Sequence, residues 1–133
     1  RDEDFVARVK ELTGGAGVDV VYDSVGKDAF PGSLDCLKPM GMWVLFGQSS
    51  GPVPPVDLGI LAAKGSLYVT RPTLFVYVAG NDDLQATARD LFDMVASGKV
   101  AIPVTQRYEL RDAAQAHRDL EGRKTTGTTV LLP

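Results

Sequence analysis

The sequence has few residues of the kinds that build metal centres, disulfides or nucleic-acid surfaces. Its 133 residues include one cysteine, Cys36, and one histidine, His117, so a disulfide within the chain and a zinc site built from these two residues alone are both excluded. We interpret Cys36 as a small buried hydrophobic residue and His117 as a packed core histidine. A single cysteine favours a cytoplasmic protein.

Clusters of positive charge and long apolar runs are also missing. Lys and Arg number 14 against 17 Asp and Glu, which gives a formal net charge of −3. This balance argues against a nucleic-acid partner. No apolar run approaches the roughly 18 residues that a membrane span needs, so we expect no membrane association, and we expect no secretory signal.

Residues 1–12 show an amphipathic helical pattern with acidic residues at its start, where the helix dipole favours negative charge. A glycine-rich segment, residues 13–17, then ends this helix. A dinucleotide-binding glycine loop follows a strand and precedes a helix, and here the order is reversed. We therefore expect a simple glycine turn. Because the chain begins at Arg1, inside a helical pattern, we interpret it as a piece of a longer protein.

Two unalternated apolar runs, Val18–Tyr22 and Met42–Phe46, predict strands that are covered on both faces in a parallel sheet. A helix is expected between them, over Lys27–Leu37. In open α/β sheets, ligands bind beyond the carboxyl ends of the strands. The segments that follow these two strands, Asp23–Gly26 and Phe46–Ser50, are therefore expected to face a ligand.

A third strand is expected over Ser66–Thr70, after a short helix over Leu58–Ala63 that Asp57 caps. Its polar alternation predicts a strand at the edge of the sheet, where another subunit often covers it. The apolar and aromatic segment Thr73–Ala79 fits either a strand or a helix, and the pattern leaves both open.

In the rest of the chain, helical and extended patterns alternate. We expect a helix that is capped by Asn81 and ends at Gly98, an extended segment over Ile102–Leu110, a helix capped by Asp112, and a strand over Thr128–Leu132. Alternating helices and strands predict an α/β fold with parallel strands in a doubly wound sheet.

Several stretches of this chain resemble the medium-chain dehydrogenase/reductase superfamily. Within it, they are most similar to the zinc-independent quinone oxidoreductases, the zeta-crystallin-like NADPH:quinone reductases. The resembling stretches are Gly17–Gly26, Ser33–Leu37, Phe46–Gly51, Lys64–Pro72, Ala114–His117 and Leu120–Arg123.

The resemblance implies that residues 1–72 form the second half of a Rossmann-like dinucleotide-binding domain. Residues 73–133 would be a carboxyl-terminal α/β segment that returns to the catalytic domain and completes it. The implied reaction is NADPH-dependent hydride transfer to a quinone or enone, without a metal and without a catalytic residue in this segment. The pyrophosphate loop and the amino-terminal substrate domain would precede Arg1.

The resemblance also implies which residues bind the cofactor: Ser24, Val25, Phe46, Gly47, Gln48, Ser49, Arg71 and Arg123. The first two would lie on the adenosine side, the segment 46–49 would line the nicotinamide half, and the two arginines would reach the cofactor. Each position also has a simpler interpretation as an ordinary turn, loop or solvated cation. Asp23 is a conceivable acid or base, with no partner visible in the sequence.

Three further hypotheses follow. The 133-residue chain alone, lacking the pyrophosphate loop, is expected to be inactive and to bind NADPH weakly. In the resembling family the Ser66–Thr70 strand pairs between subunits, which implies a homodimer. An enoyl or alkenal reductase of the same superfamily is the alternative activity, and the sequence alone does not separate these two.

Overall fold

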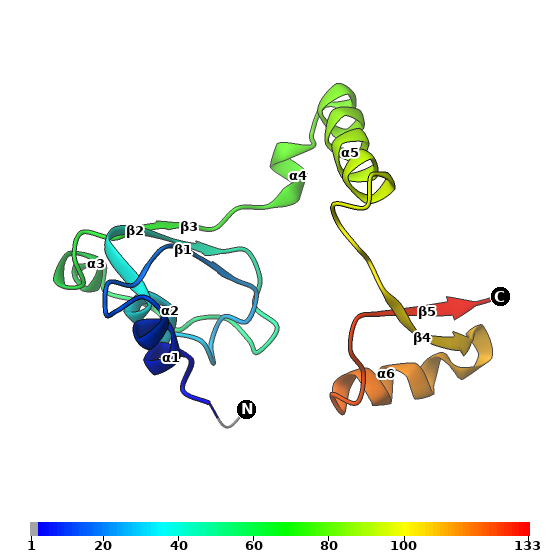
Figure 1. The fold of residues 1–133 in the computed structure, drawn as a ribbon, viewed down its shortest axis with the longest axis horizontal. Helices are drawn as coiled ribbons and strands as arrows, with labels where there is room; N and C mark the ends of the chain where they lie inside the picture. Colours follow the sequence, from blue (N-terminus) through cyan, green and yellow to red (C-terminus); the bar gives the residue numbers. More distant parts are fainter. Residues whose placement is uncertain (1–2) are drawn as a thin grey trace. The chain divides into compact units, whose positions relative to one another are not determined.

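The computed structural model describes residues 3–133, which form two units that divide between Tyr77 and Val78 (Figure 1). Each unit contains its own parallel sheet, three-stranded in the first and two-stranded in the second. The predicted α/β class with parallel strands is therefore confirmed. Among the described residues, no helix combines the length and the apolar character that crossing a membrane requires.

The sheet of the first unit has the order β1-β2-β3, with β1 at Val18–Asp23, β2 at Leu37–Leu45 and β3 at Tyr68–Thr70. Both pairs of strands are parallel, and Tyr22, Val44 and Thr70 are aligned across the sheet. The carboxyl ends of all three strands therefore lie at the same edge of the sheet. As predicted, the third strand is at the side of the sheet, with all three of its residues exposed.

Helix α1 spans Phe5–Leu12 and is capped by Asp4, whose Oδ1 accepts hydrogen bonds from Val6 N at 2.9 Å and Ala7 N at 3.1 Å. The predicted start of this helix at residues 1 and 2 lies outside the described residues. Glu3 and Asp4 precede the helix, so Asp4 stabilises it by capping rather than from its first turn.

The helix expected over Lys27–Leu37 is wrong in extent, because α2 spans only Gly32–Asp35. Pro31 stands immediately before it. A proline ring disfavours the helical conformation for the preceding residue, so a helix cannot run smoothly through Phe30 and Pro31. At the other end, Leu37 belongs to β2, where it is aligned with Val18 of β1.

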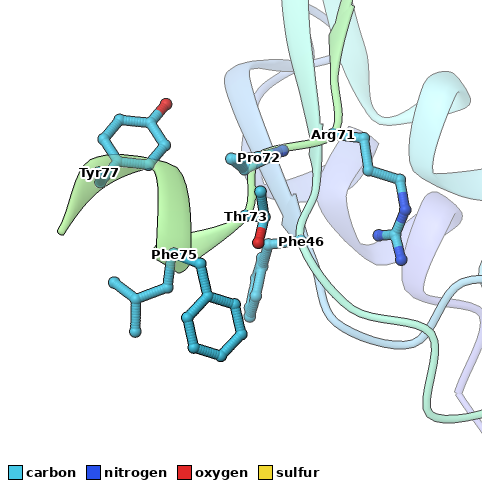
Figure 2. Close-up of a pocket in the computed structure, with 7 residues that line it drawn as sticks. Phe46, Arg71, Pro72, Thr73, Phe75 and Tyr77 are labelled. Carbon is cyan, nitrogen blue, oxygen red and sulfur yellow. The ribbon is translucent and has the colours of Figure 1, made fainter. Parts of the chain in front are cut away.

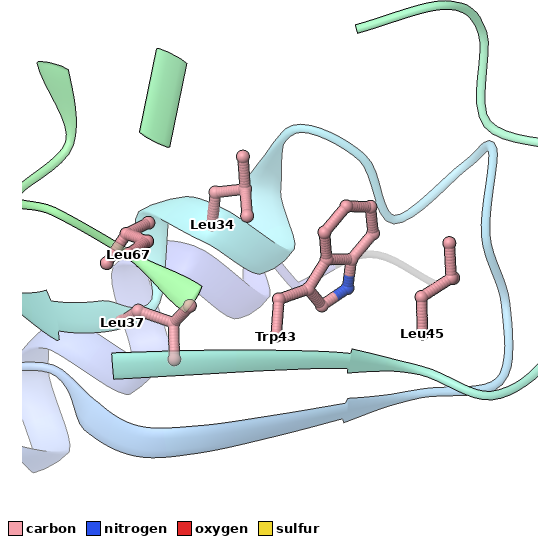
Figure 3. Close-up of a cluster of buried hydrophobic side chains, with 5 residues drawn as sticks. All are labelled: Leu34, Leu37, Trp43, Leu45 and Leu67. Atoms are coloured by element: carbon pink, nitrogen blue, oxygen red, sulfur yellow. The ribbon is translucent and has the colours of Figure 1, made fainter. Parts of the chain in front are cut away.

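The core of the first unit lies on one face of the sheet, where α2 packs against β2 (Figure 3). Its buried members are Leu34, Leu37, Trp43, Leu45 and Leu67. Cys36 is buried beside them, as predicted, and its burial raises the pKa of the thiol.

The opposite face of this sheet is open in the described chain. Val20, Tyr22 and Met42 alternate with the inward-facing residues and are exposed. The expectation of strands covered on both faces is therefore wrong for residues 3–133. In the two apolar runs that led to this expectation, side chains that point into the core alternate with side chains on the opposite, uncovered face of the sheet.

Helix α3 spans Gly59–Ala63 with Leu58 at its N-cap position, so the cap predicted at Asp57 is wrong by one residue. Asp57 Oδ1 nevertheless accepts a hydrogen bond of 2.9 Å from Gly59 N at the start of this helix. After β3, the segment that fitted either a strand or a helix contains α4, at Leu74–Tyr77. This short helix begins three residues after Arg71, close to the end of β3.

The second unit begins with α5, at Asn81–Ala96, whose apolar stripe is mostly exposed. Gly80, rather than Asn81, occupies its N-cap position, and the structure shows no side-chain cap. The cap predicted at Asn81 is therefore wrong by one residue. Gly98 follows this helix with a φ of +73°, as expected for a glycine that ends a helix.

The rest of the second unit consists of β4 at Val104–Glu109, a 3₁₀ turn at Leu110–Asp112, α6 at Ala113–Glu121 and β5 at Thr128–Leu132. The strands β4 and β5 are parallel, and the last strand has the predicted bounds. Asp112 occupies the N-cap position of α6 without making a side-chain cap.

The interpretation of His117 as a packed core histidine is wrong, because its side chain is exposed. In α6 only Ala116 is buried, over a sheet of two strands. Successive side chains of a helix differ in direction by about 100°, so His117 points away from the direction of Ala116, and a sheet of two strands is too narrow to cover it.

Candidate functional site

The segments that follow β1 and β2 are joined by main-chain hydrogen bonds. Phe46 N and Gly47 N donate to the carbonyl oxygen of Asp23, at 3.0 and 3.1 Å. Ser49 N donates to Ser24 O at 3.1 Å, and Ser50 N donates to Val25 O at 2.9 Å. We call residues 24–26 the β1 loop and residues 46–51 the β2 loop. The two loops form one hydrogen-bonded unit at the carboxyl ends of their strands.

This contact between the loops requires glycine at two positions. A Cβ on Gly47 would lie 2.6 Å from Ser24 O, and a Cβ on Gly26 would lie 2.7 Å from Gly51 O. Gly26 also has a φ of +83°, in a region that side chains rarely adopt. The resemblance implied that Gly47 lines the nicotinamide half of a cofactor. The structure adds that its missing side chain lets the β2 loop lie against the β1 loop.

Arg71 connects the end of the third strand to the end of the second. Its Nη1 donates to the carbonyl oxygen of Leu45 at 2.8 Å, and its Nη2 donates to Gln48 Oε1 at 3.2 Å. The guanidinium group therefore holds the first residues of the β2 loop in place. Its positive charge remains at the surface, where it is available to an anionic or polar ligand.

Beneath the two loops lies Asp23, a carboxylate that is only 4% exposed. Its Oδ1 accepts hydrogen bonds from Val25 N at 2.8 Å and Gly26 N at 2.9 Å. Its Oδ2 accepts hydrogen bonds from Ser33 Oγ at 2.9 Å and Trp43 Nε1 at 3.1 Å. Burial raises the pKa of this carboxyl, but the four hydrogen bonds outweigh that effect, and the pKa of Asp23 lies below its usual value.

These contacts are inconsistent with the idea of Asp23 as an acid or base. All four of its partners are donors, and they stabilise the ionised carboxylate inside the fold. The sequence contained one signal of this arrangement. A tryptophan inside an apolar strand needs an acceptor for its indole N–H, and Asp23 follows the neighbouring parallel strand.

A cavity of about 470 Å³ lies beside Arg71 (Figure 2). It is lined by Phe46, Arg71, Pro72, Thr73, Leu74, Phe75 and Tyr77. In Figure 2 the side chains of Phe46, Thr73 and Phe75 lie below Pro72, and the guanidinium group of Arg71 extends to the right of them. Phe46 and Phe75 are 52% and 84% exposed, so their rings are accessible to a planar ligand. Sequence reasoning did not predict the contribution of α4 to this cavity.

A second cavity, of about 390 Å³, lies beside the β1 loop. Ser24 and Val25 line it together with residues of β1, α1 and the segment before α2. The candidate residues of the first unit are thus divided between two hollows at the carboxyl end of the sheet. Ser24 and Val25 border one hollow, Phe46 and Arg71 border the other, and Gly47–Ser49 belong to the β2 loop.

Arg123, the eighth predicted residue, belongs to the second unit. It lies in the turn after α6, with a φ of +55°, and its N–H donates to Leu120 O at 3.0 Å. Its predicted contact with a cofactor stays a prediction. In neither unit do the residues from 3 onward contain a group of three His, Cys, Asp or Glu side chains that could hold a metal ion.

A family model and the relatives of this chain point to the same group of enzymes. The family model for zinc-binding dehydrogenases matches residues 1–131. The quinone oxidoreductase of Pseudomonas aeruginosa is 54% identical over 131 residues, which cover 98% of this chain and 40% of that protein. The 2-haloacrylate reductase of Burkholderia sp. is 45% identical over 135 residues, which cover 98% of this chain and 40% of that protein.

Among solved structures, the quinone oxidoreductase of Escherichia coli complexed with NADPH superposes with a TM-score of 0.92 at 51% identity. The superposition covers 100% of this chain and 41% of that one. The chain therefore spans about two fifths of the length of each of these three proteins.

Proposed function

Because this chain belongs to the zinc-binding dehydrogenase family, we propose that it is part of an NADPH-dependent oxidoreductase that transfers hydride to quinones. The observation that carries the proposal is the close match to the Escherichia coli quinone oxidoreductase complexed with NADPH, with a TM-score of 0.92 at 51% identity. The site geometry supports it, since the β1 and β2 loops lie where α/β sheets bind their ligands.

We further propose how these residues bind the two halves of the dinucleotide. We assign Ser24 and Val25, which border one hollow, to the adenosine side of the cofactor. We assign the segment Phe46–Ser49 to the nicotinamide half, where the exposed ring of Phe46 offers a flat apolar surface and Gln48 an amide group. Arg71 and Arg123 would supply positive charge to an anionic cofactor.

When bound, NADPH would supply from its nicotinamide ring the hydride that the quinone accepts. The residues of this chain then have three tasks. The β2 loop orients the nicotinamide ring, and Arg71 fixes that loop through Leu45 and Gln48. The aromatic side chains of the cavity beside Arg71 limit the access of water to the ring.

We propose residues 1–72 as the second half of the dinucleotide-binding domain and residues 73–133 as the segment that returns to the catalytic domain. We further propose a zinc-independent reaction and a cytoplasmic location, the latter supported by the single cysteine. The exposed edge of β3, within Ser66–Thr70, supports a homodimer in which this strand pairs with its copy. The 133-residue chain alone is expected not to turn over.

One observation favours a second candidate activity. The Burkholderia protein at 45% identity is a 2-haloacrylate reductase, so the reduction of an activated carbon–carbon double bond is the alternative. It would use the same cofactor loops and another hydride acceptor.

The test uses the full natural polypeptide that carries this sequence. Purified enzyme is mixed with NADPH and either a benzoquinone, 2-chloroacrylate or an unsubstituted enone, and the loss of NADPH absorbance is followed. We expect the highest kcat/KM with the quinone. A higher kcat/KM with 2-chloroacrylate or the enone would establish the second candidate, and no NADPH oxidation with any acceptor would refute both.

A further inference from the structure

The carboxylate of Asp23 connects the β1 loop to the core of the first unit. It lies at the end of β1, beneath the β1 loop, and is 4% exposed. One of its oxygens binds main-chain N–H groups of that loop, and the other binds side chains of the core. It is not one of the residues to which we assign cofactor contact.

The outer part of this arrangement reaches the second loop. Because Oδ1 fixes the N–H groups of Val25 and Gly26, it orients the peptide units of the β1 loop, including the carbonyl groups that face the β2 loop. Ser24 O and Val25 O accept hydrogen bonds from Ser49 N and Ser50 N. Ser50 Oγ also donates to Val25 O at 2.7 Å.

The inner part of the arrangement lies in the core of the first unit. Oδ2 accepts hydrogen bonds from Ser33 of α2 and from the indole of Trp43, a buried residue of β2. The indole ring is stacked on Phe30, with ring centroids 5.7 Å apart. The carboxylate is thus held from the core side in one position, and that position determines where the two loop N–H groups lie.

We propose that Asp23 is a positioning residue for the cofactor, acting through the β1 loop to hold the β2 loop in its binding conformation. This inference rests on the proposed function, because the two loops matter to the reaction only if they bind NADPH. A positioning residue of this kind affects cofactor affinity more than the hydride step, provided that the bound geometry is recovered once the cofactor is in place.

The substitution Asp23→Asn tests the role with little change in shape. An asparagine has one oxygen and one NH₂ group in place of two oxygens. In either orientation of the amide, its NH₂ group faces N–H donors, either those of the β1 loop or the indole of Trp43. Buried donors that face each other destabilise the arrangement.

Removing the indole donor should relieve this conflict. In Asp23→Asn combined with Trp43→Phe, the amide oxygen can accept from Val25 and Gly26 while the NH₂ group faces Ser33, whose hydroxyl can accept. The double variant should therefore recover the function that Asp23→Asn loses. Recovery by a second substitution in the core is not expected if Asp23→Asn merely loosens the fold.

The experiment measures two quantities in the full natural polypeptide: the dissociation constant for NADPH, and the hydrogen exchange of the peptide that contains residues 47–51. For Asp23→Asn we expect a dissociation constant for NADPH that is about tenfold larger, with kcat reduced less than about threefold. We also expect faster hydrogen exchange in residues 47–51. For the double variant we expect both values to return close to those of Trp43→Phe alone. Asp19→Asn is the matched control, since Asp19 lies on the same strand and pairs with Lys38 at the surface; it should change neither value.

Unchanged exchange at residues 47–51 in folded Asp23→Asn would overturn the proposal, and so would a double variant no better than Asp23→Asn. If Asp23→Asn does not fold, Ser33→Ala tests the proposal instead, because it removes only one donor to Oδ2. Faster exchange at residues 47–51 in this variant would support the positioning role of Asp23, and unchanged exchange would refute it. The exchange measurement needs no cofactor. If the enzyme does not bind NADPH, the proposed function is refuted, but the exchange measurement still tests whether Asp23 holds the β2 loop.

Discussion

The guanidinium group of Arg71 donates a hydrogen bond of 3.2 Å to the amide oxygen of Gln48. These two residues follow different strands, and both were predicted from the sequence to contact a cofactor. Their direct contact links two of the predicted site residues across the carboxyl edge of the sheet. It also means that Arg71 has a structural task even without a ligand.

Arg71→Ala should raise the KM for NADPH about tenfold, because it removes a cation from the site together with two hydrogen bonds to the β2 loop. Arg71→Lys keeps the charge but cannot form the two-armed contact, so an intermediate value is expected. Steady-state kinetics of the full natural polypeptide give the measurement. Arg8→Ala, which removes an exposed ion pair with Glu11 on α1, is the control. A wild-type KM in Arg71→Ala would contradict the assigned role.

Gly47→Ala should destabilise the first unit by about 1–3 kcal/mol, because the added methyl group would lie 2.6 Å from Ser24 O and force the loops apart. The urea midpoint of unfolding measures the change. Gly59→Ala is a matched control, since its Cβ would meet only the flexible carboxylate of Asp57, at 3.3 Å. If both variants unfold at the wild-type midpoint, the contact between the loops is not as tight as described.

Acid should weaken the fold through Asp23. The pKa of this carboxyl is lowered in the folded protein, so its ionised form stabilises the fold above the unfolded value of about 3.9. That contribution is lost as the pH falls through the folded pKa. Asp23→Asn should therefore reduce the free energy of unfolding at pH 7 and make it less dependent on pH below about pH 5. Urea unfolding at a series of pH values measures this, and an unaltered pH dependence in the variant would argue against it.

The exposed edge of β3 predicts the effect of a lysine there. Tyr68→Lys places a charge on an edge strand, which disfavours pairing with a second strand. We expect the proposed homodimer to dissociate at least about tenfold more readily, as measured by light scattering over a dilution series. Leu12→Lys, an exposed position on α1, should leave the dimer intact. A Tyr68→Lys protein with the wild-type mass at every dilution would place the interface elsewhere.

The strands of the first sheet could be predicted from short apolar or alternating runs, but β2 begins at Leu37, five residues before the predicted start at Met42, and includes Pro39 and Gly41. The last strand, Thr128–Leu132, lies between Gly127 and Pro133 and has its predicted bounds. Helices were harder to predict. The periodic pattern of Phe30, Leu34 and Leu37 looked like one long helix, but Pro31 restricts its start and the pairing of Leu37 with β1 removes its end.

Side-chain environments were less predictable than strands. A helical pattern shows which residues share a face but not how wide a surface that face meets, and His117 is exposed because α6 covers only two strands. The hydrogen bonds of Asp23 depend on the distance between two neighbouring strands, and no local pattern encodes that distance. The role of α4 beside Arg71 was hidden because a short apolar aromatic segment fits a strand and a helix equally well.

The most direct test of the central claim is a crystal structure of the full natural polypeptide with NADPH. We predict that the nicotinamide half lies against Phe46–Ser49 and Arg71, and that the adenosine side lies near Ser24 and Val25. NADPH bound without contact to the β1 and β2 loops would contradict the account.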